Sequence, residues 1–243
     1  MLFVCEIKME VPGINKVKKF ISLQGNIGAG KSTFLEKLKT IIQQRGLLSS
    51  ILLIEEPVKQ WEEKIYNGES ILQLFYDDQS LYGFRFQINA FTTRINLYIE
   101  SLRECNASDG SVLLISERSM RSDKLFFSNL YEHKLISASE WNIYNQFFDT
   151  ICNHLNSREE IMLYLDVDYM KCYERIEARG RGEEKNIKLE YLLSLQTGHH
   201  KMLEDFAQDP QKQVIKINWI DMTDEEQIIF INELLDELLL TLD

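Results

Sequence analysis

The sequence has few of the residues that interrupt or cross-link a chain. It contains three prolines, four cysteines and no low-complexity segment, so nothing marks a linker between domains. The cysteines and the four histidines lack the spacing of a CxxC motif or a metal site, which indicates reduced thiols and a cytoplasmic protein. We therefore expect residues 1–243 to form a single domain, with residues 1–17 as its lead-in segment.

Long apolar runs and positive charge are also scarce. No apolar run is long enough to span a bilayer, so we expect no membrane partner. The first 18 residues contain no arginine, which argues against a mitochondrial transit peptide. Lysine and arginine number 27 against 38 aspartates and glutamates, for a net charge of −11. This balance argues against nucleic acid as a partner but allows a small phosphorylated ligand held by a local basic cluster.

Short apolar runs alternate with longer stretches of helical periodicity, which predicts an α/β fold with a parallel sheet and crossover helices. The predicted strands are Phe20–Leu23, Ile51–Ile54, Val112–Ser116, Ile161–Leu165 and Val214–Ile217. Two predicted helices have clear ends. Lys31–Arg45 is capped by Gly46, and Leu81–Glu104 is ended by the turn-forming "NASDG".

A glycine-rich loop connects the first predicted strand to the first predicted helix. Its sequence, "GNIGAGKST", matches the phosphate-binding pattern GxxxxGK[ST]. Glycines let backbone N–H groups turn toward phosphate oxygens, and Lys31 neutralises the β and γ oxygens. The loop residues expected to bind ATP are Gly25, Asn26, Ile27, Gly28, Ala29, Gly30, Lys31, Ser32 and Thr33. The absence of GxGxxG from the loop excludes a dinucleotide-binding fingerprint.

The loop alone does not identify the acceptor of the phosphate. A GTPase would need an NKxD-type motif downstream, whereas the one Asn-Lys pair of the chain lies upstream of the loop. A chromosome- or transport-type ATPase normally brings further motifs and greater length. A small-molecule kinase remains, provided that the chain supplies a carboxylate at the acceptor and arginines that close on the phosphate.

Glu56 is the candidate carboxylate. It follows the strand Ile51–Ile54, and Pro57 keeps it out of the helical region. The carboxyl ends of strands are where α/β sheets bind their ligands; a solvated strand end is the alternative. Neighbouring side chains on a strand face opposite ways, so we expect Glu55 to point away.

Three arginines lie in the segment "CYERIEARGRGEE". Arg175 and Arg179 share one face of a helix, and Arg181 stands between two glycines. Arginines on a glycine-hinged segment suit a lid, over about residues 179–188, that closes on the transferred phosphate. The alternative is a solvated helix face whose arginines pair with neighbouring glutamates.

Five motifs together carry a resemblance. "GNIGAGKST", "EEPVKQW", "FRFQ", "ERSMRSD" and "RGRGEE...KLEYL" match, in order and spacing, the deoxyribonucleoside kinase family and its deoxycytidine/deoxyguanosine kinase branch. The resemblance implies a P-loop kinase fold, with a five-stranded parallel sheet flanked by helices and an arginine-bearing lid. It also implies a homodimer that uses Mg²⁺ and transfers the γ-phosphate of ATP to the 5′-hydroxyl of a deoxyribonucleoside, as in nucleotide salvage.

The resemblance also implies roles for individual residues. Glu56 resembles the carboxylate that accepts the proton of the 5′-hydroxyl, and Arg118 the arginine that orients this carboxylate and the 5′-oxygen. Glu117, together with Ser32, resembles the magnesium-associated pair. The other positions implied for the substrate are Tyr76 and Glu184 at the sugar 3′-hydroxyl, and Trp61, Phe86, Gln87 and Phe127 around the base.

Some positions remain open. Asp166 ends a strand that resembles a generic Walker B strand, which makes it a rival to Glu117 for magnesium. Trp61 and Phe86 could equally belong to the core, since a lone aromatic on a helix more often does. We expect His199 and His200 to lie on the surface, and we assign no role to Asp221.

The helix that begins at Leu81 carries the residues that we expect to select the nucleobase of the substrate. Gln87, Ala90 and Arg94 fall on one face of it together with Phe86. A buried Arg94 needs a partner, and Asp123 is the natural one; an ion pair on the surface is the alternative. This combination resembles the deoxycytidine and purine branch, so we expect thymidine to be a poor substrate. Rival functions are a nucleoside monophosphate kinase and a non-catalytic nucleotide-sensing module.

Overall fold

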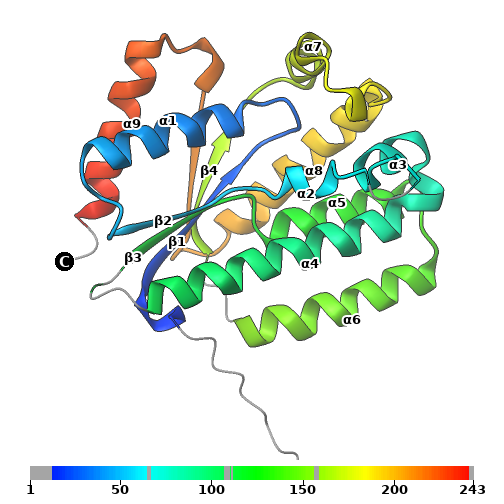
Figure 1. Ribbon diagram of the computed structural model, residues 1–243, viewed down its shortest axis with the longest axis horizontal. Helices are drawn as coiled ribbons and strands as arrows, with labels where there is room; N and C mark the ends of the chain where they lie inside the picture. Colours follow the sequence, from blue (N-terminus) through cyan, green and yellow to red (C-terminus); the bar gives the residue numbers. More distant parts are fainter. Residues whose placement is uncertain (1–12, 65–66, 107–109, 111, 156–158, 241–243) are drawn as a thin grey trace, which may run out of the picture.

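The computed structural model describes residues 13–64, 67–106, 110, 112–155 and 159–240. Within them, five parallel strands form one sheet in the order β2-β3-β1-β4-β5 (Figure 1). The strands are β1 (Val17–Gln24), β2 (Ile51–Ile54), β3 (Val112–Glu117), β4 (Glu159–Leu165) and β5 (Gln213–Ile217). The predicted α/β fold and its five strands are confirmed.

The strand order places β1 at the centre of the sheet, between β3 and β4. Every residue of β3 and the last five residues of β1 are buried, because helices cover both faces of a parallel sheet. From β1 the chain builds β2 and β3 on one side and then β4 and β5 on the other. Ligand sites in such sheets lie beyond the carboxyl ends of the strands where the winding direction changes.

The long helices form layers on both faces of the sheet (Figure 1). On one face α1 (Lys31–Gln44) contacts α9 (Asp224–Leu239). On the other, α5 (Met120–Glu132) packs between α4 (Gln79–Asn106) and α8 (Leu189–Ala207), and α6 (Ala138–Leu155) lies along α4 and α5. In the part of the chain that the structure describes, no helix is both long and apolar enough to cross a membrane.

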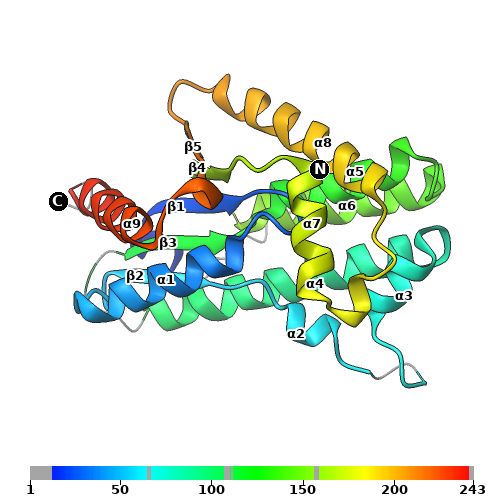
Figure 2. The ribbon, with the colours of Figure 1, turned by 90° about the horizontal axis from the view of Figure 1, so that it is seen from above.

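Shorter elements gather at the carboxyl ends of the strands. They are α2 (Val58–Trp61), α3 (Ile71–Asp77), α7 (Tyr169–Arg179) and the 3₁₀ turn η2 (Gly182–Glu184). Figure 2 shows α7 running from the side of α8 toward α2 and α3, so that η2 reaches α3. The other 3₁₀ turns are η1 (Ile14–Lys16) and η3 (Trp219–Asp221).

Three expectations from the sequence need correction. The lead-in segment ends earlier than residue 17, because η1 and the first residue of β1 already lie there; residues 1–12 are outside the described residues. Helix α4 begins at Gln79 instead of Leu81, because the Asp78 carboxylate accepts the N–H groups of Ser80 and Leu81 at 3.0 Å each and caps it.

His199 is wholly buried in α8 and not on the surface. Its Nδ1 lies 2.7 Å from the carbonyl oxygen of Leu195, and burial lowers its pKa to about 3. The ring therefore stays neutral and packs edge-on against Phe126.

Candidate active site

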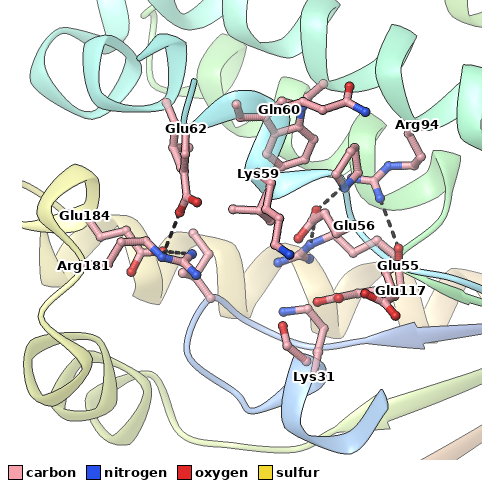
Figure 3. Close-up of a pocket in the computed structure, with 18 of the residues that line it drawn as sticks. Lys31, Glu55, Glu56, Lys59, Gln60, Glu62, Arg94, Glu117, Arg181 and Glu184 are labelled. Atoms are coloured by element: carbon pink, nitrogen blue, oxygen red, sulfur yellow. Dashed lines mark hydrogen bonds and ion pairs between the residues drawn. The ribbon is translucent and has the colours of Figure 1, made fainter. Parts of the chain in front are cut away.

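One cavity of about 980 Å³ opens at the carboxyl ends of the strands. It is lined by the glycine-rich loop, by residues that follow β2 and β3, and by parts of α2, α3, α4, α7 and η2. Figure 3 shows side chains from these separate elements converging on this space. The predicted phosphate site and the predicted acceptor carboxylate therefore share one cavity.

The loop needs glycine for two reasons. Gly28 and Gly30 have φ values of +83° and +96°, a region that side chains disfavour. A Cβ atom on Gly28 would also lie 2.5 Å from the carbonyl oxygen of Cys172 in α7. The loop is thus pressed against the helix that leads into the lid.

Lys31 is buried at the start of α1, and its ammonium donates to the carbonyl oxygens of Gly25 at 3.2 Å and Asn26 at 2.9 Å. Burial, together with the charge of Arg118, lowers its pKa to about 8, so it is protonated at neutral pH. Asn26 itself has a structural role, because its amide donates to the backbone of Leu192 at 2.8 Å. Three loop residues expected to bind ATP, Gly25, Asn26 and Ala29, are buried and are not among the residues that line the cavity.

Glu56 lies where the chain leaves β2, and its carboxylate meets two guanidinium groups. Its Oε1 is 2.8 Å from Nη2 of Arg94 and 3.1 Å from Nε of Arg118. Burial acts to raise the pKa of Glu56, but the charges of Arg118, Arg94 and Lys31 outweigh it and lower the pKa to about 2. Glu55 is exposed and pairs with Lys39 at 2.9 Å, away from the two arginines, but it also lines the edge of the cavity.

Arg118 follows β3 in a left-handed conformation, with φ of +64°. For a residue with a side chain this conformation costs about 1–2 kcal/mol, so contacts on several sides must hold it. Its N–H donates to Leu23 O at 2.9 Å, and its Nη1 donates to Gly25 O at 3.2 Å. Its guanidinium lies 4.6 Å from the centre of the Phe126 ring. The guanidinium is thereby fixed between the glycine-rich loop and Glu56.

Arg94 and Asp123 form the predicted pair, and both are buried, so the surface alternative is excluded. Nε of Arg94 lies 3.1 and 2.9 Å from the two oxygens of Asp123. Burial raises the pKa of Asp123 to about 6 and Arg94 opposes the rise, so the carboxylate is ionised at neutral pH. Arg94 also donates to the carbonyl oxygen of Glu117 at 3.1 Å. No motif predicts that the same arginine also binds Glu56.

Trp61, Phe86 and Gln87 all line the cavity, and Trp61 and Phe86 are also part of the buried core. Trp61 is oriented by a 3.0 Å hydrogen bond from its Nε1 to Thr93, and its ring meets Phe86 edge-on. Gln87 is buried, and no hydrogen bond within the described residues uses its side-chain amide. One donor and one acceptor on this wall are therefore available to a ligand.

The prediction for Phe127 is wrong. Its ring is wholly buried and stacks on Tyr144, with centroids 3.7 Å apart, in the packing between α5 and α6. Phe126 lines the cavity in its place. Positions three and four after Asp123 both lie near its face of a helix, so spacing alone could not separate the two rings.

Tyr76 and Glu184, the residues expected at the sugar 3′-hydroxyl, both line the cavity. The buried carboxylate of Glu184 accepts from Arg179 at 2.5 Å and from Arg181 at 3.2 Å. Burial, with the nearby Tyr191 and Glu184, raises the pKa of Tyr76 well above its usual range, so its hydroxyl remains a donor. Tyr191 also lines the cavity with a hydroxyl that has no protein partner among the described residues. It is part of the "KLEYL" motif, but the motif alone predicts no role for it.

The three predicted lid arginines all line the cavity. Nε of Arg175 donates to the carbonyl oxygen of Gly28 at 2.9 Å, which holds it over the loop. Arg179 and Arg181 pair with Glu184, as the alternative interpretation of this segment expects. They also face the cavity, and their role in a lid stays a prediction.

The chemistry of Glu117 fits a ligand for a divalent cation. Its carboxyl group lines the same cavity as Lys31 and Ser32, and burial together with the charge of Glu56 raises its pKa. A cation would offset the cost of keeping this buried carboxyl group ionised. Mg²⁺ is commonly held by one or two carboxylates plus substrate phosphates. Asp166 is exposed and outside the cavity, which favours Glu117 over its rival.

A glycine-rich loop, a largely buried carboxylate and several arginines that line one cavity are the arrangement expected of a P-loop kinase with a hydroxyl acceptor. Comparison with known proteins agrees. The model of the family "Deoxynucleoside kinase" matches residues 21–238. The chain is 32% identical over 232 residues to a "Probable deoxycytidine kinase" of fowlpox virus, which covers 93% of this chain and 91% of the relative.

Two further relatives extend the comparison. Human deoxycytidine kinase is 35% identical over 77% of this chain and 76% of its own. The mitochondrial deoxyguanosine kinase of Xenopus laevis is 30% identical over 76% and 73%. A solved structure, deoxyadenosine kinase from M. mycoides with bound dCTP, has the same fold, with a TM-score of 0.68 and 23% identity over 90% of this chain and 99% of that one.

The chain belongs to the deoxynucleoside kinase family, in the branch of the deoxycytidine and deoxyguanosine kinases. It is an ATP-dependent deoxyribonucleoside kinase.

The role of Glu56 can be tested by Glu56→Gln, which keeps the size of the side chain and removes its charge. We expect kcat to fall by about 10²–10⁴-fold, the usual contribution of a placed base, while nucleoside binding is largely retained. Steady-state kinetics and equilibrium binding measure the two effects. Glu55→Gln is the matched control and is expected to be nearly silent. A Glu56→Gln protein within a few-fold of wild type would remove Glu56 from the chemistry.

The metal position can be tested by comparing Glu117→Gln with Asp166→Asn across a Mg²⁺ titration. Glu117 lies in the cavity and Asp166 outside it, so the first substitution is expected to reduce Mg²⁺-dependent turnover much more than the second. The reverse ranking would move the metal role to the end of β4.

Proposed function

We propose that the protein phosphorylates the 5′-hydroxyl of deoxycytidine or of a purine deoxyribonucleoside in preference to thymidine, in nucleotide salvage. The observation that carries the base preference is the buried Arg94–Asp123 pair beside Gln87 and Ala90. A fixed guanidinium on this wall leaves no apolar space for the 5-methyl group of thymine. The names of the human and Xenopus relatives agree with this preference.

In the proposed reaction Glu56 accepts the hydrogen bond, and finally the proton, of the 5′-hydroxyl. A carboxylate with a pKa of about 2 is a weak base, so its effect depends on position more than on basicity. Phosphoryl transfer tolerates this, because its transition state is loose and gains mainly from alignment and charge stabilisation. Lys31 and the lid arginines supply that charge at the phosphate, and Arg118 holds Glu56 in line.

Magnesium is part of the proposal. Glu117 and Ser32 would hold Mg²⁺ together with the phosphates of ATP, and the ion would neutralise charge that develops on the β and γ oxygens. The raised pKa of Glu117 supports this, since a buried carboxylate that lacks a cation favours its neutral form.

A nucleoside monophosphate kinase fits the cavity less well. An acceptor phosphate would lie beside the ionised carboxylate of Glu56, which repels it, whereas a hydroxyl acceptor gains from that carboxylate. A non-catalytic sensing module would not need cavity residues that act in phosphoryl transfer, such as Lys31 and Glu56.

We also propose that two copies associate through α4 and α6 and act in the cytoplasm. These helices pack together, with the rings of Phe91 and Phe147 5.7 Å apart, and Figure 1 shows them along one side of the molecule. Leu81, Ile143 and Phe147 expose large apolar side chains there, as a self-complementary surface would. Burial raises the pKa of the Cys152 and Cys172 thiols to about 11, which suits reduced cysteines in a reducing compartment.

The most direct test of the function uses purified protein, labelled ATP and the four deoxyribonucleosides side by side. We expect deoxycytidine, deoxyadenosine or deoxyguanosine to give a much higher kcat/KM than thymidine. Thymidine as the best substrate would contradict the proposed pocket and leave the kinase assignment intact.

The pocket itself is tested by Arg94→Met combined with Asp123→Ala. The double change removes the buried charges and opens apolar space, so kcat/KM for thymidine relative to deoxycytidine is expected to rise at least about tenfold, the lower end of discrimination by one methyl-sized group. Arg94→Met alone should raise thymidine activity less than the double change does, because it leaves the buried Asp123 without its cation. An unchanged ratio in the double variant would exclude the pair as the specificity determinant.

The dimer is tested by sedimentation. Wild-type protein is expected at twice the monomer mass of 28.6 kDa, and Ile143→Glu on α6 is expected to shift it to monomer. Ile229→Glu, on the exposed surface of α9, is the matched control and should remain dimeric. A monomeric wild type at micromolar concentration would contradict the proposal.

A further inference from the structure

Glu62 makes a contact across the mouth of the cavity that none of the motifs assigns. It follows directly after α2, and its Oε1 lies 3.0 Å from Nε of Arg181 in the lid. Figure 3 shows Arg181 between Glu62 on one side and Glu184 on the other. The contact therefore joins the segment that carries Trp61 to the segment that closes over the phosphate.

The second carboxylate fixes the guanidinium group in place. Nη1 of Arg181 donates to Oε1 of Glu184 at 3.2 Å, while Nε faces Glu62. Within the described residues no hydrogen bond uses Nη2 of Arg181, so this group remains available to a phosphate oxygen. When two edges of a planar guanidinium are held, the N–H groups on its third edge point in a fixed direction.

Glu184 alone would hold Arg181 less firmly. Glu184 belongs to the lid itself, so its contact moves with Arg181. The arginine also stands directly after Gly180, which has φ of +64° and ends α7 in a left-handed cap, and before Gly182. Another contact, from Asn186 to Asp77 at 2.5 Å, attaches the lid to α3 but does not touch the guanidinium.

We propose that Glu62 is a positioning residue, which acts through Arg181 to hold its guanidinium ready for the phosphate that is transferred. The inference rests on the proposed function, in which Arg181 acts on phosphate during transfer. Because the ion pair holds the arginine and not the nucleoside, its loss lowers kcat and leaves nucleoside affinity unchanged.

The test compares Glu62→Gln with Glu63→Gln in the full-length protein. Glu63 is the next residue in the chain, is exposed and has no ion pair within the described residues. Its replacement by glutamine therefore changes the net charge by the same amount as Glu62→Gln. The side chains of Glu62 and Arg181 are 27% and 32% exposed, which limits the expected loss of kcat in Glu62→Gln to about two- to fivefold. The dissociation constant of the nucleoside, measured by equilibrium binding, should stay at its wild-type value, and Glu63→Gln should match wild type in both.

A double-mutant cycle shows whether Glu62 works through Arg181. With Arg181→Ala as background, Glu62→Gln is expected to cause no further loss of kcat. Three results would overturn the inference: equal kcat in the two glutamate variants, a loss confined to nucleoside binding, or the same fold-loss with and without Arg181. Wild-type protein without kinase activity would instead refute the proposed function, so the two failures are distinguishable.

Discussion

The site depends on one ionised carboxylate held between two guanidinium groups. Glu56 is largely buried, and a buried carboxylate without partners costs several kcal/mol. Arg94 and Arg118 remove that cost and keep its pKa near 2. Both arginines are buried as well, so each needs its own partners, and these fix where they lie. Arg94 is held by Asp123, and Arg118 by the backbone of Gly25.

This requirement explains why the site draws on so many parts of the fold. Glu56 comes from the end of β2, Arg94 from α4, Arg118 from the end of β3 and Asp123 from α5. β3 lies between β1 and β2 in the sheet, so the ends of these strands bring the carboxylate, the arginine and the phosphate-binding loop together. The left-handed conformation of Arg118 is the local cost of this arrangement.

Much of this was predictable from the sequence, for physical reasons. The five strands follow from apolar runs, and the pairing of Arg94 with Asp123 follows from the rule that a buried charge needs a partner. Contacts between segments that are distant in the sequence were harder to predict. Helical spacing could not separate Phe126 from Phe127, and nothing local marks His199 as buried. The contacts of Arg94 with Glu56 and of Glu62 with Arg181 join segments that only the tertiary structure brings together.

Glu56 stays ionised in the folded protein because two arginines hold it, and a measurement of its pKa tests this directly. Protein labelled with ¹³C at the glutamate carboxyl carbons, compared with the Glu56→Gln variant, identifies its NMR signal for a pH titration. A pKa lowered from 4.5 to about 2 stabilises the fold above about pH 4.5, and this contribution is lost as the pH falls toward 2. If the two arginines hold Glu56 ionised, the signal keeps the chemical shift of an ionised carboxylate from pH 7 down to pH 4. A transition to the protonated form within that range would contradict it.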